Sequence, residues 1–562
     1  MNVKSYFGNR NFQIAPVFVF ILTALVVGQK VGPDRPRNYD VKNYTIRVSF
    51  DRAKKIVYGD TIVELTPLAA PLISIDLDAV GLKFSKVTLS HGETPLTYRL
   101  GERQISVKLD RSYSSGENVS LRFSYSITDP KKGIYFIDAE KAVNKFQHPA
   151  QIWTQNEPED ARYWFPSFDF PSDKATSDEY ITVQKGEVAV GNGRLIDDAQ
   201  NADGTITYHY RMNVPHSTYL TSFVAGDFVK LSDKYKDVPL AFYAYSERRR
   251  VAGIAFSRTK DMMSDFETLT GIPFPFEKYD QTMVAGFQDF DGMENVTATT
   301  LADTSILFAE YPFGKPIVEN LVSHELAHSW FGNMVTCKNW SELWLNEGFA
   351  TFMEATFREK AYGRANYLQK LIEDRDEFIT DDAVGKYHHP LRNLSAQADN
   401  SLFDATTYQK GGVVLHMLRE TVGDAAFWKG VNIYLTNHKF GNVESADLQH
   451  AMEEASGQKL QVFFDQWVYA AGYPKLEVTW LNESSTNTVK ITVNQVQKDD
   501  GETPAAFQFP LEATLSTESG ATVHALNITK RTETFSLKVS EPVKKIEIDK
   551  SEKILLKSVK LK

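Results

Sequence analysis

Residues 324–328 read HELAH, and residues 344–348 read WLNEG. His324 and His328 are one helical turn apart, so their side chains point the same way and can share one metal ion. Glu347, on a following helix, can supply a third ligand. Two imidazoles and one carboxylate leave a fourth position open, which is typical of a catalytic zinc ion and not of a structural one. The two segments therefore predict a pair of helices around one zinc ion per chain.

Glu325 lies beside these histidines but is out of phase with them on the helix. It is better placed to hold a metal-bound water than to bind the ion. We expect the helix to begin at Pro316 and to end at Gly332-Asn333. Its apolar residues are spread around most of its circumference, which predicts a buried helix. Polar groups inside such a helix need a partner, and a zinc ion provides one.

The second helix is expected to begin near Ser341-Glu342. Glu342 and Glu354 are candidates for hydrogen bonding to the histidine ligands. The following residues should point inward beside Glu347: Leu345, Phe349, Phe352 and Met353.

Three further segments accompany the zinc motif. Residues 155–158 read QNEP, residues 292–295 read GMEN, and residues 408–411 read YQKG. Together with residues 324–349, they resemble in order and spacing the motifs of the zinc aminopeptidases of the aminopeptidase N type. The resemblance covers roughly residues 35 to 562.

The resemblance implies removal of N-terminal amino acids from peptides by attack of water on the first peptide bond. Zinc lowers the pKa of its bound water to about 7. Glu325 would act as general base on that water and then pass the proton to the leaving amine. By resemblance, Tyr408 donates a hydrogen bond to the tetrahedral oxyanion, and losing such a donor typically costs about a hundredfold to a thousandfold in rate.

The resemblance also implies that Glu157 and Glu294 bind the free α-ammonium group of the substrate. A charge tally agrees with this. Zinc contributes two positive charges. Four carboxylates contribute four negative charges, so the site keeps a net charge of −2; they are those of Glu157, Glu294, Glu325 and Glu347. A buried excess of negative charge needs a cation, and the substrate's ammonium is one.

The substrate-binding segment departs from the family's Gly-x-Met-Glu-Asn motif at its first position. Asp291 stands there, followed by Gly292, Met293, Glu294 and Asn295. Two interpretations stay open. Either Asp291 points away and changes little, which we favour, or it faces the pocket for the first substrate residue and favours Lys or Arg there.

The pattern along the chain predicts an α+β multidomain fold. Residues 30–238 alternate between apolar and polar, which predicts an N-terminal, mostly antiparallel β domain. Residues 239–472 read as a mainly helical catalytic domain, which the resemblance makes thermolysin-like. Residues 473–562 read as a small C-terminal β-sandwich. Many family members continue into a large helical domain, so we expect this shorter form to lack it and to have a more open cleft.

Residues 1–28 hold two basic residues followed by an apolar stretch. This predicts a signal peptide cleaved after Gly28 or a retained membrane anchor, and in both cases an extracytoplasmic catalytic part, secreted or periplasmic or anchored at this end. Cys337 is the only cysteine, so no disulfide can form within the chain. A buried small hydrophobe is the favoured interpretation of Cys337, ahead of a metal ligand.

The net charge of −10 argues against nucleic acid as a partner. Peptides with a free N-terminus are the expected partners. Three alternatives stay open: an epoxide hydrolase of the leukotriene hydrolase type, a thermolysin-like endopeptidase, and a non-catalytic peptide-binding module. An endopeptidase should not need Glu157 and Glu294, and should cleave amino-blocked peptides as fast as free ones.

Overall fold

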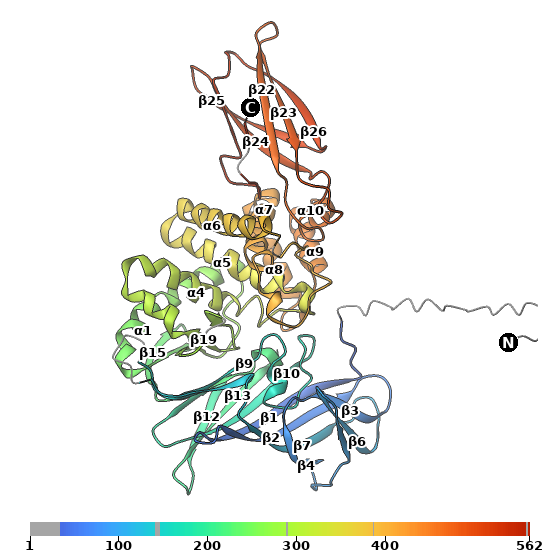
Figure 1. Ribbon diagram of the computed structural model, residues 1–562, viewed down its shortest axis with the longest axis vertical. Coiled ribbons are helices and arrows are strands. Elements are labelled where there is room, and N and C mark those ends of the chain that lie inside the picture. The colour runs from blue at the N-terminus through green and yellow to red at the C-terminus, as the bar shows by residue number, and fades with distance from the viewer. Residues whose placement is uncertain (1–33, 141–146, 288–289, 386, 558–559, 562) are drawn as a thin grey trace, which may run out of the picture. The chain divides into compact units, whose positions relative to one another are not determined.

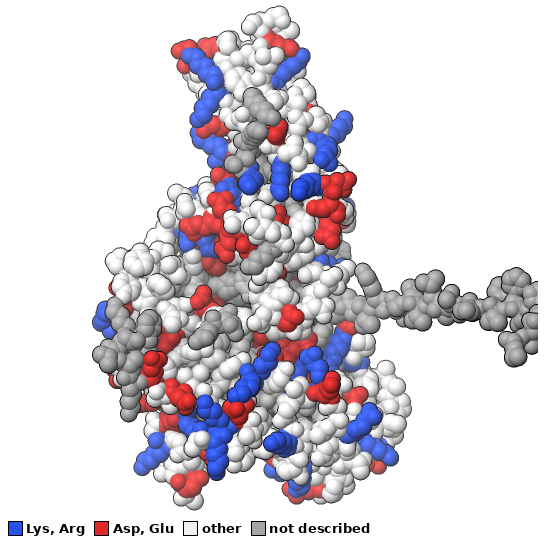
Figure 2. Space-filling model, in the orientation of Figure 1, with Lys and Arg blue, Asp and Glu red and all other residues white. Residues whose placement is uncertain are grey.

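The computed structural model describes residues 34–562 except 141–146, 288–289, 386, 558–559 and 562 (Figure 1). The predicted signal peptide or anchor, residues 1–28, lies outside the described residues. Within the described part of the chain, none of the helices combines the length and the apolar character needed to cross a membrane. Figure 2 shows acidic and basic side chains interspersed over the visible face of the protein.

The N-terminal part is built from β-strands, as the alternating pattern predicts. Its larger sheet has the order β12 (Arg194–Gln200), β13 (Ile206–Ser217), β10 (Lys174–Val183), β1 (Tyr39–Asp51), β2 (Ile56–Pro67), β7 (Val119–Thr128) and β4 (Lys83–Leu89). Neighbouring strands are antiparallel except for the β1–β10 pair. Alternate residues of β1 and β7 are buried, so one face of this sheet contacts the core.

Two smaller sheets complete this part. One has the order β11 (Val188–Gly191), β14 (Phe223–Gly226), β9 (Gln151–Gln155) and β8 (Gly133–Ile137), and the other has the order β3 (Leu72–Asp78), β6 (Gln104–Tyr113) and β5 (Tyr98–Leu100). Strand β9 is buried along its whole length and ends just before Glu157. It therefore fixes where that carboxylate enters the site.

The middle part opens on a mixed sheet with the order β15 (Val229–Tyr235), β16 (Val238–Ala244), β17 (Tyr279–Val284), β19 (Ala298–Ala302) and β18 (Gly292–Met293). Strand β18 is at one edge of the sheet, and Glu294 follows it directly. The α-helices are α1 (Arg249–Ala255), α2 (Thr259–Thr270), α3 (Asp303–Ile306), α4 (Lys315–Ala327), α5 (Trp344–Tyr362), α6 (Arg364–Ala383), α7 (Gly411–Val422), α8 (Asp424–Asn437), α9 (Ser445–Ser456) and α10 (Gln461–Trp467). Short 3-10 turns join several of them, and β20 (Thr336–Cys337) pairs with β21 (Asn442–Val443).

Helices α4 and α5 differ in burial. Helix α5 is buried from Trp344 to Phe357, which includes every residue expected to point inward. Helix α4 was expected to be buried and to end at Gly332; the burial is confirmed only for its C-terminal part, and the predicted end is wrong. Ile317 is exposed, and the helix ends at Ala327, so His328 caps it.

The C-terminal part is again made of β-strands. One sheet has the order β26 (Thr532–Lys538), β23 (Thr488–Gln495), β22 (Leu476–Glu483) and β28 (Lys560–Leu561), and the other has the order β25 (Ala521–Ile528), β24 (Phe509–Ser516) and β27 (Lys545–Ile548). A β-rich first part, a helical middle and a β-rich end are thus confirmed. The predicted domain boundaries at residues 238 and 472 stay predictions.

Candidate metal centre

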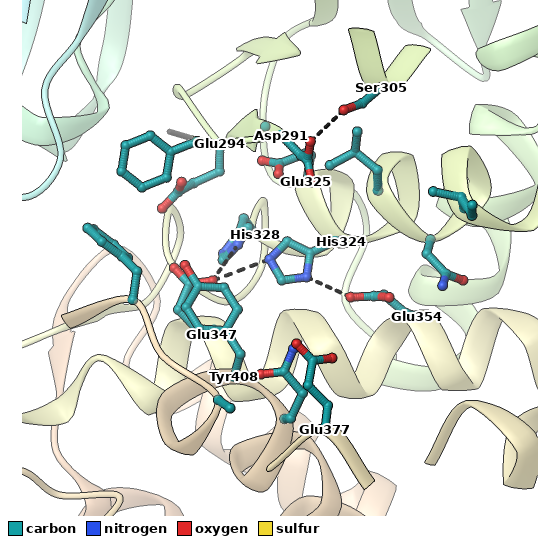
Figure 3. A pocket seen from close by; sticks show the side chains of 18 of the residues that line it. Asp291, Glu294, Ser305, His324, Glu325, His328, Glu347, Glu354, Glu377 and Tyr408 are labelled. Atoms are coloured by element: carbon teal, nitrogen blue, oxygen red, sulfur yellow. Dashed lines mark hydrogen bonds and ion pairs between the residues drawn. The ribbon is translucent and has the colours of Figure 1, made fainter. Parts of the chain in front are cut away.

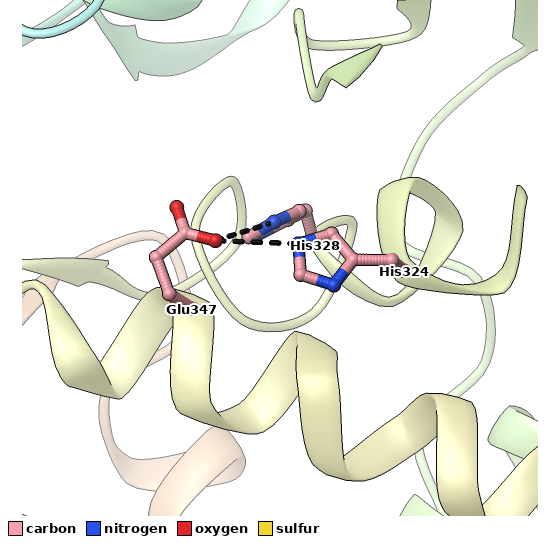
Figure 4. A group of neighbouring side chains, drawn as sticks. All are labelled: His324, His328 and Glu347. Atoms are coloured by element: carbon pink, nitrogen blue, oxygen red, sulfur yellow. Dashed lines mark hydrogen bonds and ion pairs between the residues drawn. The ribbon is translucent and has the colours of Figure 1, made fainter. Parts of the chain in front are cut away.

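Helices α4 and α5 bring the three predicted ligands together (Figure 4). The Nε2 atoms of His324 and His328 each lie 3.3 Å from Oε2 of Glu347. These three atoms form one of the groups in which all candidate ligand atoms lie within 4.8 Å of one another. The pair of His side chains at the end of α4 therefore faces a single carboxylate oxygen from the first turn of α5.

The other ring nitrogens decide the tautomers. Nδ1 of His328 lies 2.9 Å from the carbonyl oxygen of Phe331, which can only accept, so Nδ1 carries the proton. Nδ1 of His324 lies 2.9 Å from Oε1 of Glu354. With Nδ1 held in this way, each Nε2 can present its lone pair to an ion bound between it and Glu347, as ligating imidazoles do when a carboxylate or carbonyl group holds the other nitrogen.

The donor set fits a zinc ion. Zinc–ligand bonds of about 2.0–2.1 Å in a tetrahedral arrangement separate the ligand atoms by roughly 3.3–3.4 Å, close to the spacing found here. Burial alone would lower the pKa of His328, but Glu347 and Glu294 outweigh it and raise that pKa to about 9. Burial raises the pKa of Glu347, yet His328 and His324 prevail and lower it to about 2. The cluster thus attracts positive charge to the point between these side chains.

Glu325 lies on the other side of the cluster, against strand β18. Burial is the main reason why its pKa rises to about 8, although His324 and His328 oppose the rise. A Cβ atom on Gly292 would lie 2.1 Å from Oε1 of Glu325, so the strand can pass this close only with glycine at that position. Gly292 is therefore needed to make room for the predicted base.

Buried carboxylate oxygens without a hydrogen-bond partner line this site. They are Oε1 of Glu157, Oε1 of Glu294 and Oε2 of Glu325, and these residues are 6%, 3% and 5% exposed. Burial raises the pKa of Glu157 well above its ordinary value, and the charge of Glu294 adds to the effect. An unpaired buried carboxylate is costly, so these three atoms indicate cations or a bound water that belong there.

Hydrogen bonds to neighbouring elements hold the Gly292–Asn295 segment in place. The backbone oxygen of Glu294 accepts from Nδ2 of Asn333 at 2.9 Å, and Oδ1 of Asn295 accepts from the hydroxyl of Thr300 at 3.0 Å. The sulfur of Met293 lies 3.4 Å from Nε2 of Gln155. Met293 is buried, so its side chain supports the segment from within the core.

Tyr408 belongs to the π-helical turn η8 (Thr406–Lys410) that precedes α7. Its ring is parallel to that of His324, with 5.9 Å between the ring centroids. Burial and the nearby carboxylates raise its pKa well above 10, so the hydroxyl keeps its proton and can donate. The structure thus brings together all of the predicted catalytic, ligand and ammonium-binding side chains.

These residues line a cavity of about 840 Å³ (Figure 3). Asp291 is part of its wall and accepts a hydrogen bond from Ser305. Its carboxylate is thus engaged by Ser305, and both interpretations of Asp291 stay predictions. Cys337 is buried and belongs to none of the candidate ligand groups found among the described residues, in agreement with its interpretation as a small hydrophobe.

The sequence analysis named two candidate hydrogen-bonding partners of the histidine ligands, of which one is wrong. It also missed a residue that acts through the correct one. Glu354 contacts His324 as expected, but Glu342 is bound instead by Arg392 and Ser445. The missed residue is Lys370 of α6, whose Nζ lies 3.0 Å from Oε2 of Glu354. The i,i+4 spacing of Lys370 and Asp374 predicts only their own pair, not a contact with α5.

Comparisons with known proteins agree with this arrangement. The family model described as "Peptidase family M1 domain" matches residues 254–467, and the one described as "Peptidase M1 N-terminal domain" matches residues 36–220. Aminopeptidase 2 of Candida albicans is 29% identical over 82% of this chain and 50% of its own length. Tricorn protease-interacting factor F2 of Thermoplasma acidophilum is 29% identical over 86% and 59%, and glutamyl aminopeptidase of Bos taurus is 33% identical over 60% and 36%. The chain thus spans about half the length of these curated relatives.

Proposed function

The chain belongs to peptidase family M1, and from that premise we propose that it is a zinc-dependent aminopeptidase. The observation behind the proposal is the close approach of His324, His328 and Glu347 beside two buried carboxylates, Glu157 and Glu294, whose Oε1 atoms have no partner. The first three residues would hold one zinc ion per chain. The last two would bind the α-ammonium of a peptide.

The chain's own side chains would then divide the work. A bound ion would supply Lewis acidity and a more acidic water molecule. Glu325 would take the proton of that water on its unpartnered Oε2 and deliver it to the departing amine. Tyr408 would donate its hydroxyl proton in a hydrogen bond to the oxygen of the scissile carbonyl as negative charge develops there.

The carboxylates favour an aminopeptidase over an endopeptidase. An internal peptide segment brings no cation to Glu157 and Glu294, so both would stay buried without a counter-ion. A free N-terminus provides that cation and at the same time fixes which bond lies at the metal. Because the bound N-terminus places the first peptide bond at the metal, the enzyme would remove one residue at a time.

Three finer statements belong to the same proposal. The middle part would have a thermolysin-like arrangement of its zinc-binding helices. The C-terminal strands would form one small sandwich. The enzyme would work outside the cytoplasm, because residues 1–28 read as a signal peptide or anchor.

The test compares a leucyl chromogenic amide with its N-acetyl counterpart, each with and without a chelator. We expect hydrolysis of the free amide only, loss of activity with chelator, and recovery when zinc is added back. Glu325→Gln should lower kcat by roughly 10²–10⁴-fold. Equal cleavage of the acetylated substrate would favour an endopeptidase, and full activity after metal removal would overturn the proposal.

A further inference from the structure

The turn that carries Tyr408 is an unusual piece of helix. In η8 the backbone N–H of Lys410 bonds to the carbonyl oxygen of Ala405 at 2.9 Å, five residues back, which is the π-helical pattern. Such turns are rare, and those that occur are often found at functional sites. The first N–H groups of a helix lack partners within it. Residues outside η8 must therefore hold its start, and with it Tyr408.

Asp404 holds the start of this turn. Its Oδ1 accepts the backbone N–H of Thr407 at 2.8 Å, and its carbonyl oxygen accepts the backbone N–H of Tyr408 at 3.0 Å. A carboxylate at this position satisfies an N–H group that the helix leaves free, and its charge is favoured by the helix dipole. Asp404 thus bonds to the backbone of the predicted oxyanion donor and of the residue before it.

His389 binds the other oxygen of the same carboxylate. Its Nε2 lies 2.7 Å from Oδ2 of Asp404, and its Nδ1 lies 2.7 Å from the carbonyl oxygen of Pro390. An ionised carboxylate and a carbonyl oxygen can only accept, so both ring nitrogens donate and the ring carries a positive charge. The side chain of Asp404 is 1% exposed, and a carboxylate buried to this extent needs such a counter-ion.

The segment that carries His389 is itself held from several sides. The hydroxyl of Thr406 donates to the carbonyl oxygen of Tyr387 at 2.7 Å, which is a second contact between this segment and η8. Nδ1 of His388 lies 2.6 Å from Oδ1 of Asp382 in the last turn of α6. Tyr387 has φ +61°, which is uncommon for a residue with a bulky side chain and persists only where the surroundings fix it. His389 is therefore presented to Asp404 from a fixed backbone.

The reaction is sensitive to where the turn lies. A donor stabilises an oxyanion when it lies about 2.7–3.1 Å from the oxygen that becomes charged. A displacement of about 1 Å can cost roughly 100-fold in rate. The carboxylate of Asp404 is bound to Thr407 and His389, so it acts on the reaction through the backbone of η8 and the position of Tyr408.

We propose that His389 and Asp404 are positioning residues, an ion pair that fixes the π-helical turn and thereby the hydroxyl of Tyr408. This inference rests on the proposed function, in which Tyr408 stabilises the oxyanion. The pair is separate from the groups that orient the metal ligands, which are Glu354 and the carbonyl of Phe331. Loss of the pair should therefore slow the reaction without weakening the binding of zinc.

The test replaces one ring nitrogen of His389 at a time. His389→Gln places an amide N–H near Nε2 and can still donate to Asp404, whereas His389→Asn places one near Nδ1 and keeps only the contact with Pro390. For an aminoacyl chromogenic amide we expect kcat, counted per bound zinc, to fall by about 10- to 100-fold in His389→Asn. It should stay near the wild-type value in His389→Gln. KM should change little, as expected for an interaction made only in the transition state, and so should the zinc affinity measured with a chromogenic chelator.

A second comparison shows whether the effect passes through Tyr408. In a Tyr408→Phe background the hydroxyl is already absent, so His389→Asn should lower kcat no further. His209→Asn is the matched control, because Nε2 of His209 in β13 also lies 2.7 Å from a carboxylate, that of Asp178, but His209 does not line the cavity. The control should keep the wild-type kcat.

Three outcomes would overturn the inference and leave the proposed function intact. They are a wild-type kcat in His389→Asn, an equal loss of kcat with and without the Tyr408 hydroxyl, and a zinc affinity that falls together with kcat. A wild-type protein that hydrolyses no aminoacyl amide, or a Tyr408→Phe variant as active as the wild type, would instead contradict the proposed function or its use of Tyr408, and the inference would fall with it.

Discussion

At the scale of single residues, a line of alternating charges fixes one ligand of the metal centre. Nδ1 of His324 is bound by Glu354, which is bound by Lys370, which in turn is bound by Asp374. Burial would raise the pKa of Glu354, but Lys370 and His324 prevail and lower it to about 2. Glu354 therefore stays ionised and keeps the lone pair of Nε2 directed at the ion site. Lys370 is a positioning residue in this scheme, because it touches neither ion nor substrate.

Lys370→Met should accordingly weaken zinc binding by about 10- to 100-fold, the range seen when hydrogen-bonding partners of metal ligands are removed. Competition with a chromogenic chelator measures this affinity without reference to activity. Lys370→Arg should restore most of it. Lys360→Met, which removes an exposed lysine of α5, serves as control. Unchanged zinc affinity in Lys370→Met would show that Glu354 needs no cation.

A second residue-scale prediction concerns a carboxyl group far from the metal. Glu179 of β10 is buried, and burial raises its pKa to about 8 against an ordinary value of 4.5, although a hydrogen bond from the backbone N–H of Asn192 opposes the rise. The folded protein therefore holds a proton that the unfolded chain releases. This contribution to stability is complete below about pH 4.5 and is lost as the pH rises through 8.

Glu179→Gln cannot ionise, and its side-chain oxygen can still accept from Asn192. The variant should gain stability relative to the wild type as the pH rises from 5 to 8, with little difference at pH 5. Melting temperatures of both proteins across this range give the measurement. Parallel curves at all pH values would mean that Glu179 is ionised at no cost in the folded state.

At the scale of elements, two glycines bring the tyrosine segment close to the ligand helix. Gly348 of α5 and Gly411 at the start of α7 touch backbone to backbone, and a Cβ atom on either would lie within 3.0 Å of the other residue's Cα. Both glycines follow site residues, Glu347 and Tyr408, in the sequence. The spacing between a metal ligand and the predicted oxyanion donor therefore depends on this contact.

Gly411→Ala and Gly348→Ala should each push α5 and α7 apart. We expect a loss of about 1–3 kcal/mol in stability from the added methyl group and a fall in kcat, because Tyr408 moves away from its position beside His324. Thermal denaturation and turnover of an aminoacyl amide report the two effects. Gly253→Ala in α1 is the control, because the added Cβ atom would meet only Leu231, at an ordinary contact distance of 3.7 Å. A Gly411→Ala variant as active and as stable as the wild type would rule out the close contact.

Periodicity and breakers predicted most of the elements but not where α4 ends. The sequence suggested Gly332 as the stop, yet the helix ends at Ala327, three residues after His324, and His328 caps it. The reason is local: Asn333 donates its backbone N–H to the oxygen of His328, and Gly332 adopts φ +130°, so the chain turns back over Phe331. Such a turn is made by individual hydrogen bonds, which leave no periodic pattern of apolar residues from which they could be predicted.

At the scale of the whole molecule, the site combines segments that are distant in the chain. The resemblance grouped Glu157, Glu294 and Tyr408 correctly, although spacing alone cannot bring them together. The bonds that join the N-terminal strands to the catalytic part were not predictable: Asn192 donates to the oxygen of Val296, and Lys174 to that of Asn333. Nothing in the sequence around Asn192 or Lys174 indicates these bonds, because their partners are more than a hundred residues away and meet them only in the folded chain.

One ion would join α4 to α5 among several buried carboxylates. Its removal should therefore lower the free energy of unfolding of the whole protein. Free zinc at a hundred times its Kd adds about 2.7 kcal/mol to the stability, so chelation should lower the melting temperature by several degrees at pH 7.5. The shift should shrink as the pH falls, since protons on His324 and His328 compete with the ion. His328→Ala should melt lower than the wild type and show no further shift with chelator. Equal shifts in both proteins, or none in the wild type, would place the stabilising metal elsewhere or exclude it.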